Sequence, residues 1–589
     1  MPIFSRSSYL IMVSRISYFL CLATLAWAAC FYPRWEKSGT ENTLSWDVSG
    51  YYWYLPSVFI YHDLKEQKFK DGILNTYQFT GTEFQQGMQM ENGNYVLKYS
   101  SGMAVMYAPF FFIAHSIAPL TGYPPDGFSK PYMIAIAWSS LLIAGLGLWY
   151  LRKLLLRYYN DLTVAIVLLL LVIGSNYLNY AAIDGALSHN WLFTLYVFLL
   201  LATDNFYKTP KTKYAVFIGL LCGLATLARP TEIISLLIPF LWQMEGISAT
   251  ALKKKWNFLQ THFPKLLLAA ACFILIVSLQ FLYWKYVSGH WVVYSYGDQG
   301  FSWRHPHFWD YTLSYRSGWI TYTPLAIFFF IGILPFIRYG KNKIAILCFF
   351  FINYYIVCAW DIWWYAGTGG RAMIQSYPVL LFPMASFIHF ILQRKWRWAI
   401  AAPFLLLCAY VNIWFTIQAH GGQSLYDSES MTKEYYWRVV GRFDVAEEVK
   451  KLKDTKELLE EWKPAATQLM YTDGTEECLD AARQNTKEHT IPFSEKNKNW
   501  LRAEADFTIP VKEWNVWKMT QFKIALLNKS TVVKENWIRV QRLMADGETR
   551  TISVDIKIPD ADIDHITVSA WNAGSEKMIC IKNVRVYGY

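Results

Sequence analysis

A series of apolar segments, most of them long enough to cross a bilayer, constrains this chain more than any other feature. Of its 589 residues 54% are hydrophobic and only 17% are charged, against about 25% in soluble domains. This composition excludes a single soluble domain, a disordered chain, a collagen and a coiled coil. The mean hydropathy of +0.17 is low for a chain that lies entirely in the membrane. The sequence therefore predicts a polytopic helical membrane protein with an additional polar domain.

The loops between the apolar segments orient them. The segments are 9–31, 104–120, 130–151, 161–181, 187–203, 214–229, 231–244, 266–288, 319–339, 343–360, 373–392 and 398–417. The basic loops all fall on one side of the membrane if 104–120 lies in the outer interface as an amphipathic helix. We therefore expect about 11 spans, with the N-terminus in the cytoplasm and the C-terminus outside.

Charge separates the polar domain from the membrane part. Residues 421–589 carry 25 Lys and Arg against 27 Asp and Glu, so the first 420 residues hold a net charge of +13. This excess indicates topology and lipid contact rather than nucleic-acid binding. We expect three regions: a transmembrane module over 1–420, an extracytoplasmic helical linker region over 421–497, and a β-sandwich over 498–589.

The polar part shows two patterns. Residues 431–463 read as an amphipathic helix that ends near Pro464. Beyond residue 498, alternating segments at about ten-residue spacing predict the strands of a β-sandwich. These segments are Trp500–Ile509, Trp517–Leu527, Val532–Leu543, Thr549–Ile558, Ile566–Trp571 and Met578–Val586. Cys478 and Cys580 are the two cysteines of the polar part, and a disulfide between them is left open by the sequence.

Two candidate site residues follow the first span. Asp47 lies among aromatic residues at the membrane surface, where a carboxylate can serve as a general base toward a hydroxyl. Its alternative is a solvated loop aspartate. Lys98, in Lys98-Tyr-Ser-Ser-Gly102, is placed to pair with a lipid phosphate, or alternatively to extend its charge to the interface.

Further candidates occur at outer ends of later spans. Asp184 lies at an outer turn with His189 five residues on, and its alternative is a helix N-cap. The Leu-Ala-Arg229-Pro-Thr-Glu232 segment interrupts an apolar stretch, as in broken helices that line cavities. Arg229 suits a planar anion such as phosphate, while an internal Arg229–Glu232 ion pair is the alternative.

A glycine-rich turn precedes the last candidate, Arg371. The backbone N–H groups of this turn are suited to bind an anion. The alternative is that the segment is only an aromatic belt followed by a turn. His305 and His307 flank a proline, which is weak evidence for a metal pair. We predict no metal or other cofactor, while a divalent metal stays open.

The order of these motifs resembles the GT-C superfamily of polytopic glycosyltransferases. The similarity spans roughly residues 10–420, and it extends to protein O-mannosyltransferases, lipid A aminoarabinose transferases and enzymes of rhizobial lipopolysaccharide assembly. Val48 follows Asp47 where many relatives have a second acid, which weakens a metal site in this loop. The last domain resembles a jelly-roll carbohydrate-binding module.

The resemblance implies an inverting transferase of the cell envelope. Such enzymes move a sugar from a polyprenyl-phosphate-linked donor to a glycan, lipid or protein acceptor on the outer face of the inner membrane. Asp47 and Asp184 then match the outer-face acids, and Lys98 matches the residue that faces the donor phosphate. Arg229 and Arg371 are similar in placement to cavity arginines. Glu232 and His189 complete the expected substrate-binding set.

Other classes of protein fit parts of the same pattern. A transporter or flippase of lipid-linked sugars accounts for the broken helix and the basic cavity, but not for an odd span count with a large outer domain. An O-antigen ligase or polymerase is a further enzymatic alternative. A sugar-binding receptor that uses only the last domain leaves the membrane acids without a role.

Overall fold

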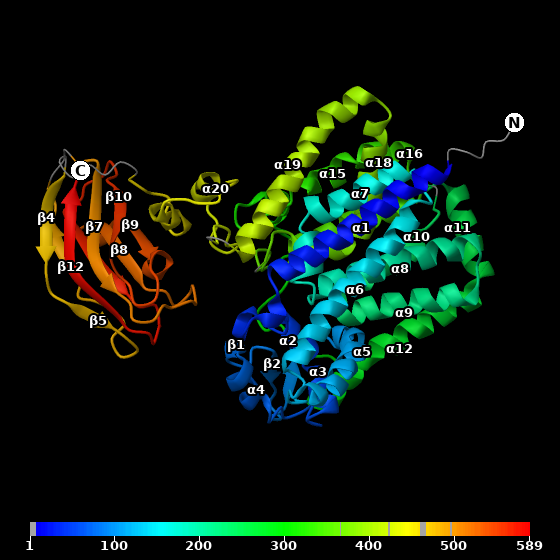
Figure 1. The fold of residues 1–589 in the computed structure, drawn as a ribbon, viewed down its shortest axis with the longest axis horizontal. Helices are drawn as coiled ribbons and strands as arrows, with labels where there is room; N and C mark the ends of the chain where they lie inside the picture. Colours follow the sequence, from blue (N-terminus) through cyan, green and yellow to red (C-terminus); the bar gives the residue numbers. More distant parts are fainter. Residues whose placement is uncertain (1–6, 245, 366, 422–423, 460–466, 495–497) are drawn as a thin grey trace. The chain divides into compact units, whose positions relative to one another are not determined.

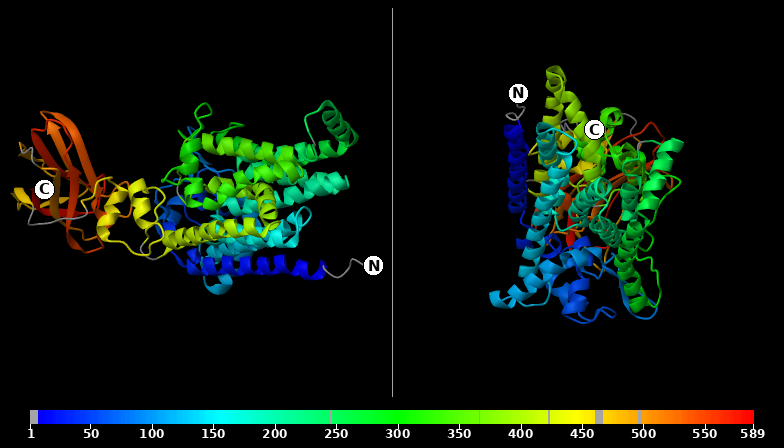
Figure 2. Two further views of the ribbon diagram at one scale, coloured as in Figure 1. Left: turned by 90° about the horizontal axis from the view of Figure 1, so that it is seen from above. Right: turned by 90° about the vertical axis from the view of Figure 1, so that its right-hand side faces the viewer.

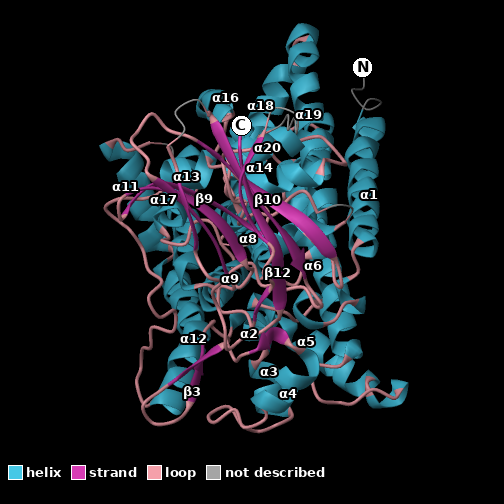
Figure 3. Ribbon diagram, turned by 90° about the vertical axis from the view of Figure 1, so that its left-hand side faces the viewer, coloured by secondary structure: helices cyan, strands magenta, loops and turns pink. Residues whose placement is uncertain are grey.

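The structure is a computed structural model that describes residues 7–589 except 245, 366, 422–423, 460–466 and 495–497. The chain forms two compact units, Met1–Ser424 and Leu425–Tyr589. Figure 3, coloured by secondary structure, shows that unit 1 is helical and that the long strands belong to unit 2. The predicted fold class, a helical membrane protein followed by a β-sandwich, is confirmed.

Unit 1 is built from long apolar helices that lie side by side (Figures 1 and 2). These are α1 (Ser7–Phe31), α6 (Lys130–Leu155), α7 (Asp161–Gly174), α8 (Ser188–Lys208), α9 (Thr212–Ala228), α12 (Phe263–Ser288), α17 (Lys343–Ala359), α18 (Tyr377–Leu392) and α19 (Lys395–His420). Within the described part of the chain, five helices are long and apolar enough to cross a membrane, and further apolar helices are shorter. The chain is thus a multi-pass membrane protein, and the count of 11 spans stays a prediction.

Short elements connect the long helices. They are α2 (Asp47–Tyr52), α3 (Tyr54–Phe59), α4 (Lys70–Tyr77), β1 (Phe79–Thr82), β2 (Gly87–Gln89), β3 (Tyr95–Leu97), α5 (Gly102–Ile117), α10 (Leu237–Leu241), α11 (Ala249–Thr261), α13 (Phe308–Leu313), α14 (Trp319–Tyr322), α15 (Ile327–Ile331) and α16 (Ile333–Tyr339). The predicted segment 319–339 is therefore not one helix. Pro324 opens a 3-10 turn there, because proline lacks the N–H group that an uninterrupted helix needs.

The interruption at Arg229-Pro230 has the same physical origin. A residue that precedes proline is driven out of the helical region, and Arg229 is extended with φ −145° and ψ 118°. Helix α9 consequently ends at Ala228, and the chain continues as the 3-10 helix η5 (Pro230–Leu236). The predicted break between the two halves of this stretch is therefore present.

Unit 2 contains a β-sandwich of two antiparallel sheets. The first sheet has the order β10-β7-β12-β4, with β5 also paired to β12, and the second has the order β6-β11-β8-β9. Their bounds are β4 Gln468–Asp473, β5 Glu477–Leu479, β6 His489–Pro492, β7 Trp500–Thr508, β8 Gln521–Asn528, β9 Thr531–Arg539, β10 Thr549–Lys557, β11 His565–Trp571 and β12 Ile579–Gly588. Successive strands repeatedly change sheets, which is the connectivity of a jelly roll.

The register follows the alternation seen in the sequence. Leu501, Ala503, Ala505 and Phe507 of β7 point into the core between the sheets. Strands β4, β5 and β6 lie within 421–497, so the sandwich begins earlier than the predicted residue 498. A disulfide between Cys478 and Cys580 joins β5 to β12, which settles the pairing that the sequence left open.

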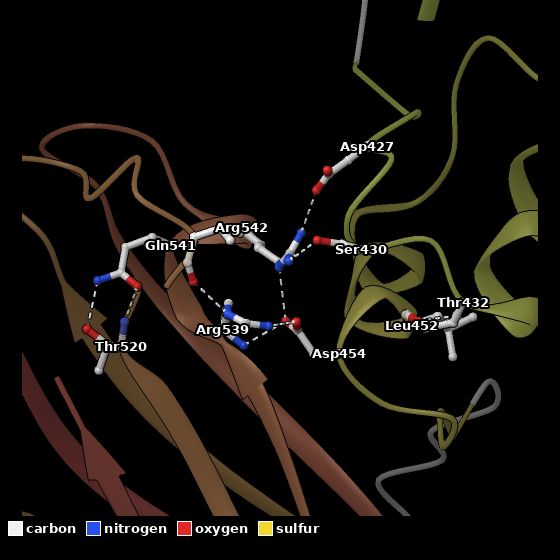
Figure 4. A network of polar contacts seen from close by, with 10 residues as sticks. Asp427, Ser430, Thr432, Leu452, Asp454, Thr520, Arg539, Gln541 and Arg542 are labelled. Carbon is white, nitrogen blue, oxygen red and sulfur yellow. Dashed lines mark hydrogen bonds and ion pairs between the residues drawn. The ribbon is translucent and has the colours of Figure 1, made fainter. Parts of the chain in front are cut away.

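The helix predicted over 431–463 is wrong. The structure has a short helix α20 (Lys433–Val439) and a 3-10 helix η8 (Glu447–Lys453), and residues 460–463 lie outside the described part. Gly441 interrupts the helix with φ +78°. Asp454 pairs with Arg539 at 2.5 Å and with Arg542 at 3.2 Å (Figure 4). Asp454 therefore forms ion pairs with the β-sandwich and does not lie on the polar face of a long helix.

Candidate functional site

One cavity of about 430 Å³ in unit 1 collects most of the predicted site residues. It is lined by Asp47, Lys98, His189, Arg229, Glu232 and Arg371. Aromatic side chains, among them Tyr51, Tyr99, Tyr296, Trp360 and Tyr365, form much of the remaining wall. Three cationic groups, two carboxylates and several ring faces therefore meet in one place.

Asp47 begins helix α2, directly after a strained residue. Trp46 has φ +50°, a conformation that side chains other than glycine rarely adopt. The Asp47 carboxylate accepts a hydrogen bond from the Tyr99 hydroxyl at 2.8 Å and pairs with Arg371 at 3.1 Å. Burial and the nearby Asp47 charge hold the pKa of Tyr99 well above its usual value, so its hydroxyl stays a donor. Asp47 is thus a positioned carboxylate rather than a freely solvated one.

A close backbone contact between Gly102 and Ala228 brings Lys98 and Arg229 to the same cavity. A β-carbon at Gly102 would lie 2.2 Å from the backbone nitrogen of Ala228, so only glycine permits this approach of α5 to the end of α9. The Lys98-Tyr-Ser-Ser-Gly102 segment is thereby held beside Arg229. This contact is why two motifs distant in sequence share one cavity.

No carboxylate among the described residues forms a hydrogen bond or an ion pair with either cation, although Glu232 interacts electrostatically with Arg229. The Lys98 ammonium lies near the rings of Tyr99 and Tyr296, at 5.7 Å and 5.6 Å from their centroids. The Arg229 guanidinium has one described hydrogen-bond contact, at 3.4 Å to Nδ1 of His189. Two positive groups without a directly paired carboxylate therefore face the same cavity.

Glu232 and His189 belong to a buried network instead. Glu232 accepts hydrogen bonds from the Tyr196 hydroxyl at 2.6 Å and from the Gln375 side chain at 3.0 Å. The other end of Gln375 lies 3.0 Å from Nδ1 of His189. No ion pair joins Glu232 to Arg229 in the described part of the chain, so the alternative of an internal Arg229–Glu232 pair does not hold.

Arg371 follows a tight turn that positions it. Gly370 has φ +72°, and a β-carbon there would lie 2.1 Å from the Trp319 ring. The Arg371 guanidinium stacks on Tyr365 at 4.2 Å while one of its terminal nitrogens pairs with Asp47. Its Nε is buried and has no hydrogen-bond partner among the described atoms.

Asp184 lies apart from this cavity. It lines a second cavity of about 340 Å³, whose wall also contains Asp47, Tyr365 and Arg371. Asp184 forms an ion pair with Arg34 and accepts a hydrogen bond from Asn179 at 2.8 Å. Burial opposes its ionisation, but Arg34, His420 and the hydrogen bond from Asn179 together outweigh burial and hold the pKa of Asp184 below its usual value. Asp184 is therefore an ionised partner of Arg34 rather than a free base.

Sequence reasoning missed four contributors to the site. Tyr99 stands beside the predicted Lys98, and Gln375 follows Arg371 by one helical turn, so proximity in sequence carried some signal for both. The sequence gives no signal for Arg34 or Tyr196. Each contacts a site residue, Asp184 and Glu232 respectively, only because the helices pack together. The described residues contain no group of three or more His, Cys, Asp or Glu suited to a metal ion.

Comparison with known proteins gives a distant similarity in structure alone. No family model and no curated protein matches the sequence. An apo oligosaccharyltransferase of Archaeoglobus fulgidus is similar over 74% of this chain and 58% of that chain, with 14% identity and a TM-score of 0.39. Its complex with an inhibitory peptide and a dolichol-phosphate matches over 71% and 57%, with 14% identity and a TM-score of 0.36.

The arabinosyltransferase EmbB of Mycobacterium smegmatis matches over 81% of this chain and 59% of that chain, with 11% identity and a TM-score of 0.30. The chain thus spans less than two thirds of the length of each of these proteins. Both enzymes are glycosyltransferases, the class that the sequence resembles. At TM-scores below 0.5 the similarity assigns no role to any residue, and the roles proposed below rest on the geometry of the site.

Proposed function

We propose that this protein is an inverting glycosyltransferase that moves a sugar from a polyprenyl-phosphate-linked donor to an acceptor at the outer face of the inner membrane. The observation that carries the proposal is the cavity that a positioned carboxylate, Asp47, shares with two cations, Lys98 and Arg229, neither of which is directly paired with a described carboxylate. A transporter of lipid-linked sugars also accounts for the cations, and the carboxylate that Tyr99 holds in place favours the transferase.

The chemistry follows from these groups. The donor phosphate binds near Lys98 and Arg229, which stabilise the charge that develops on the departing phosphate. The acceptor hydroxyl attacks the anomeric carbon from the opposite side while Asp47 takes its proton. The bond from carbon to phosphate oxygen breaks, and its electron pair leaves with the phosphate. The products are the glycosylated acceptor, with inverted configuration, and polyprenyl phosphate.

The aromatic wall supports a sugar substrate, because ring faces of Tyr51, Tyr296 and Trp360 present apolar surface beside polar groups. The Cys478–Cys580 disulfide supports an extracytoplasmic unit 2, since disulfides persist in oxidising compartments. The proposed acceptor is a glycan, a lipid or a protein of the cell envelope.

The substitution Asp47→Asn tests the role of the base. It keeps the volume and removes the charge, so we expect a loss in rate on the order of 10²–10⁴ in an assay with a polyprenyl-phosphate sugar. Asp63→Asn is the matched control, because Asp63 accepts backbone hydrogen bonds in the same outer region and does not line the cavity. Equal small losses from both variants would show that Asp47 is not the base.

A further inference from the structure

The ion pair between Asp47 and Arg371 conflicts with a role of Asp47 as a base. A carboxylate oxygen that is engaged by a guanidinium is not free to accept a hydrogen bond from an acceptor hydroxyl in the same direction. Oδ2 of Asp47 lies 3.1 Å from a terminal nitrogen of Arg371, and their side chains are only 28% and 14% exposed. Both oxygens of Asp47 therefore have described partners within the protein.

The contacts of Asp47 divide its two oxygens between different partners. Oδ1 accepts the hydrogen bond of Tyr99, while Oδ2 faces Arg371. If Arg371 moves away, Tyr99 still fixes the position of the carboxylate. The second oxygen then becomes available to a hydroxyl proton without any movement of helix α2.

Arg371 is equipped to exchange its partner. It lines the same cavity as Lys98 and Arg229, and its buried Nε has no described partner. The Arg371 guanidinium lies over the Tyr365 ring, 4.2 Å from its centroid. Phosphate oxygens bind a guanidinium through two parallel hydrogen bonds, a geometry in which arginine exceeds lysine.

We propose that binding of the donor phosphate draws Arg371 from Asp47 to the phosphate, so that the base is released only when a donor is present. The inference rests on the proposed function and adds a donor-gated step to it. Before the donor binds, Arg371 is a positioning residue for Asp47. After the donor binds, Arg371 is a ligand of the donor phosphate.

If Arg371 changes its partner from Asp47 to the donor phosphate, the two anions compete for it. A role of Arg371 in phosphate binding alone predicts no such competition. If Asp47 competes with phosphate for Arg371, Asp47→Asn binds polyprenyl phosphate more tightly although it is a poor catalyst. We expect the dissociation constant of undecaprenyl phosphate, measured with the full-length protein in detergent, to fall about 3- to 30-fold, the scale of one partly exposed charge-assisted hydrogen bond.

Two further variants test whether tighter binding comes from the release of Arg371 or from the loss of any negative charge in the cavity. Glu232→Gln removes one negative charge from the same cavity, while Glu232 has no described contact with Arg371. We expect it to tighten binding less than Asp47→Asn does. In an Arg371→Met background, Asp47→Asn should no longer tighten binding, because the shared partner is gone.

The outcomes are distinct. Equal tightening by Glu232→Gln and Asp47→Asn, or a gain from Asp47→Asn that persists without Arg371, would overturn the exchange while leaving the proposed function intact. A wild-type protein that does not bind undecaprenyl phosphate at all would overturn the proposed function itself. Thermal unfolding of each variant in the same detergent confirms that the comparison is made between folded proteins.

Discussion

Arg229→Met is the substitution from which the structure predicts most about donor binding. The guanidinium faces the cavity, and its described hydrogen-bond contact is the 3.4 Å approach to His189. The side chain of methionine fills the volume of the arginine stem. The variant also removes the electrostatic support that Arg229 gives the buried Glu232 carboxylate, so its thermal unfolding is compared with that of the wild type.

The magnitude of the binding loss follows from one charge-assisted hydrogen bond to the donor phosphate. Such bonds contribute about 1.5–3 kcal/mol, which corresponds to a roughly 10- to 150-fold weaker binding of polyprenyl phosphate. The extended backbone that Pro230 imposes on Arg229 is retained in the variant, so the loss reports the side chain rather than the break in the helix.

Lys98→Met should weaken binding by a similar factor, and the double variant by less than the product of the two. The Gly102–Ala228 contact brings both residues to one cavity, so they share a single phosphate and their effects are coupled. Arg229→Lys keeps the charge and loses the planar fork. Partial binding by this variant would attribute the effect to charge rather than geometry.

The assay is titration of the detergent-solubilised protein with undecaprenyl phosphate, with turnover of a polyprenyl-phosphate sugar as a second readout. Arg304→Met is the matched control, because Arg304 is exposed in the 289–318 loop and does not line the cavity. Wild-type affinity in Arg229→Met, Lys98→Met and the double variant would refute the phosphate site, and strictly multiplicative losses would refute a shared phosphate.

Three further predictions concern topology and unit 2. A reporter fused after Tyr589 should be active only outside the cytoplasm, and cytoplasmic activity would contradict the proposed sidedness. In residues 425–589 expressed alone, Cys478→Ser should lower the free energy of unfolding by about 3–5 kcal/mol in urea titrations, because the Cys478–Cys580 bond closes a separation of 102 residues; an unchanged midpoint would disprove this. Burial lowers the pKa of His489 below 6.5, so the unfolded chain takes up a proton first and stability should fall as pH drops below about 6.5. His489→Gln should flatten that slope between pH 7.5 and about 5.5 in the same titrations, and an unchanged slope would contradict the assignment.

The sequence by itself determined the elements whose signal is local. Alternation with period two placed β7 and β10 nearly to the residue, because each strand buries one face against the core. The dipeptide Arg229-Pro230 fixed the end of α9 through the backbone sterics of proline. Long apolar runs likewise located α6, α12 and α19, since their length and composition are properties of the segment alone.

Tertiary structure decided what those elements do together. The helix expected over 431–463 does not form, because Gly441 turns the chain and Asp454 pairs with Arg539 of the sandwich. Asp184, predicted as a second acid of the site, pairs with Arg34, a residue 150 positions away that the sequence did not connect to it.

The same holds for the core of the site. Asp47 meets Arg371 across 324 positions and Tyr99 across 52. No periodicity extends over such separations. These contacts depend on how closely helices pack, as where Gly102 admits the backbone of Ala228. The sequence thus pointed to the charged residues, but only packing determined which of them are directly paired and which line the cavity without a directly paired carboxylate.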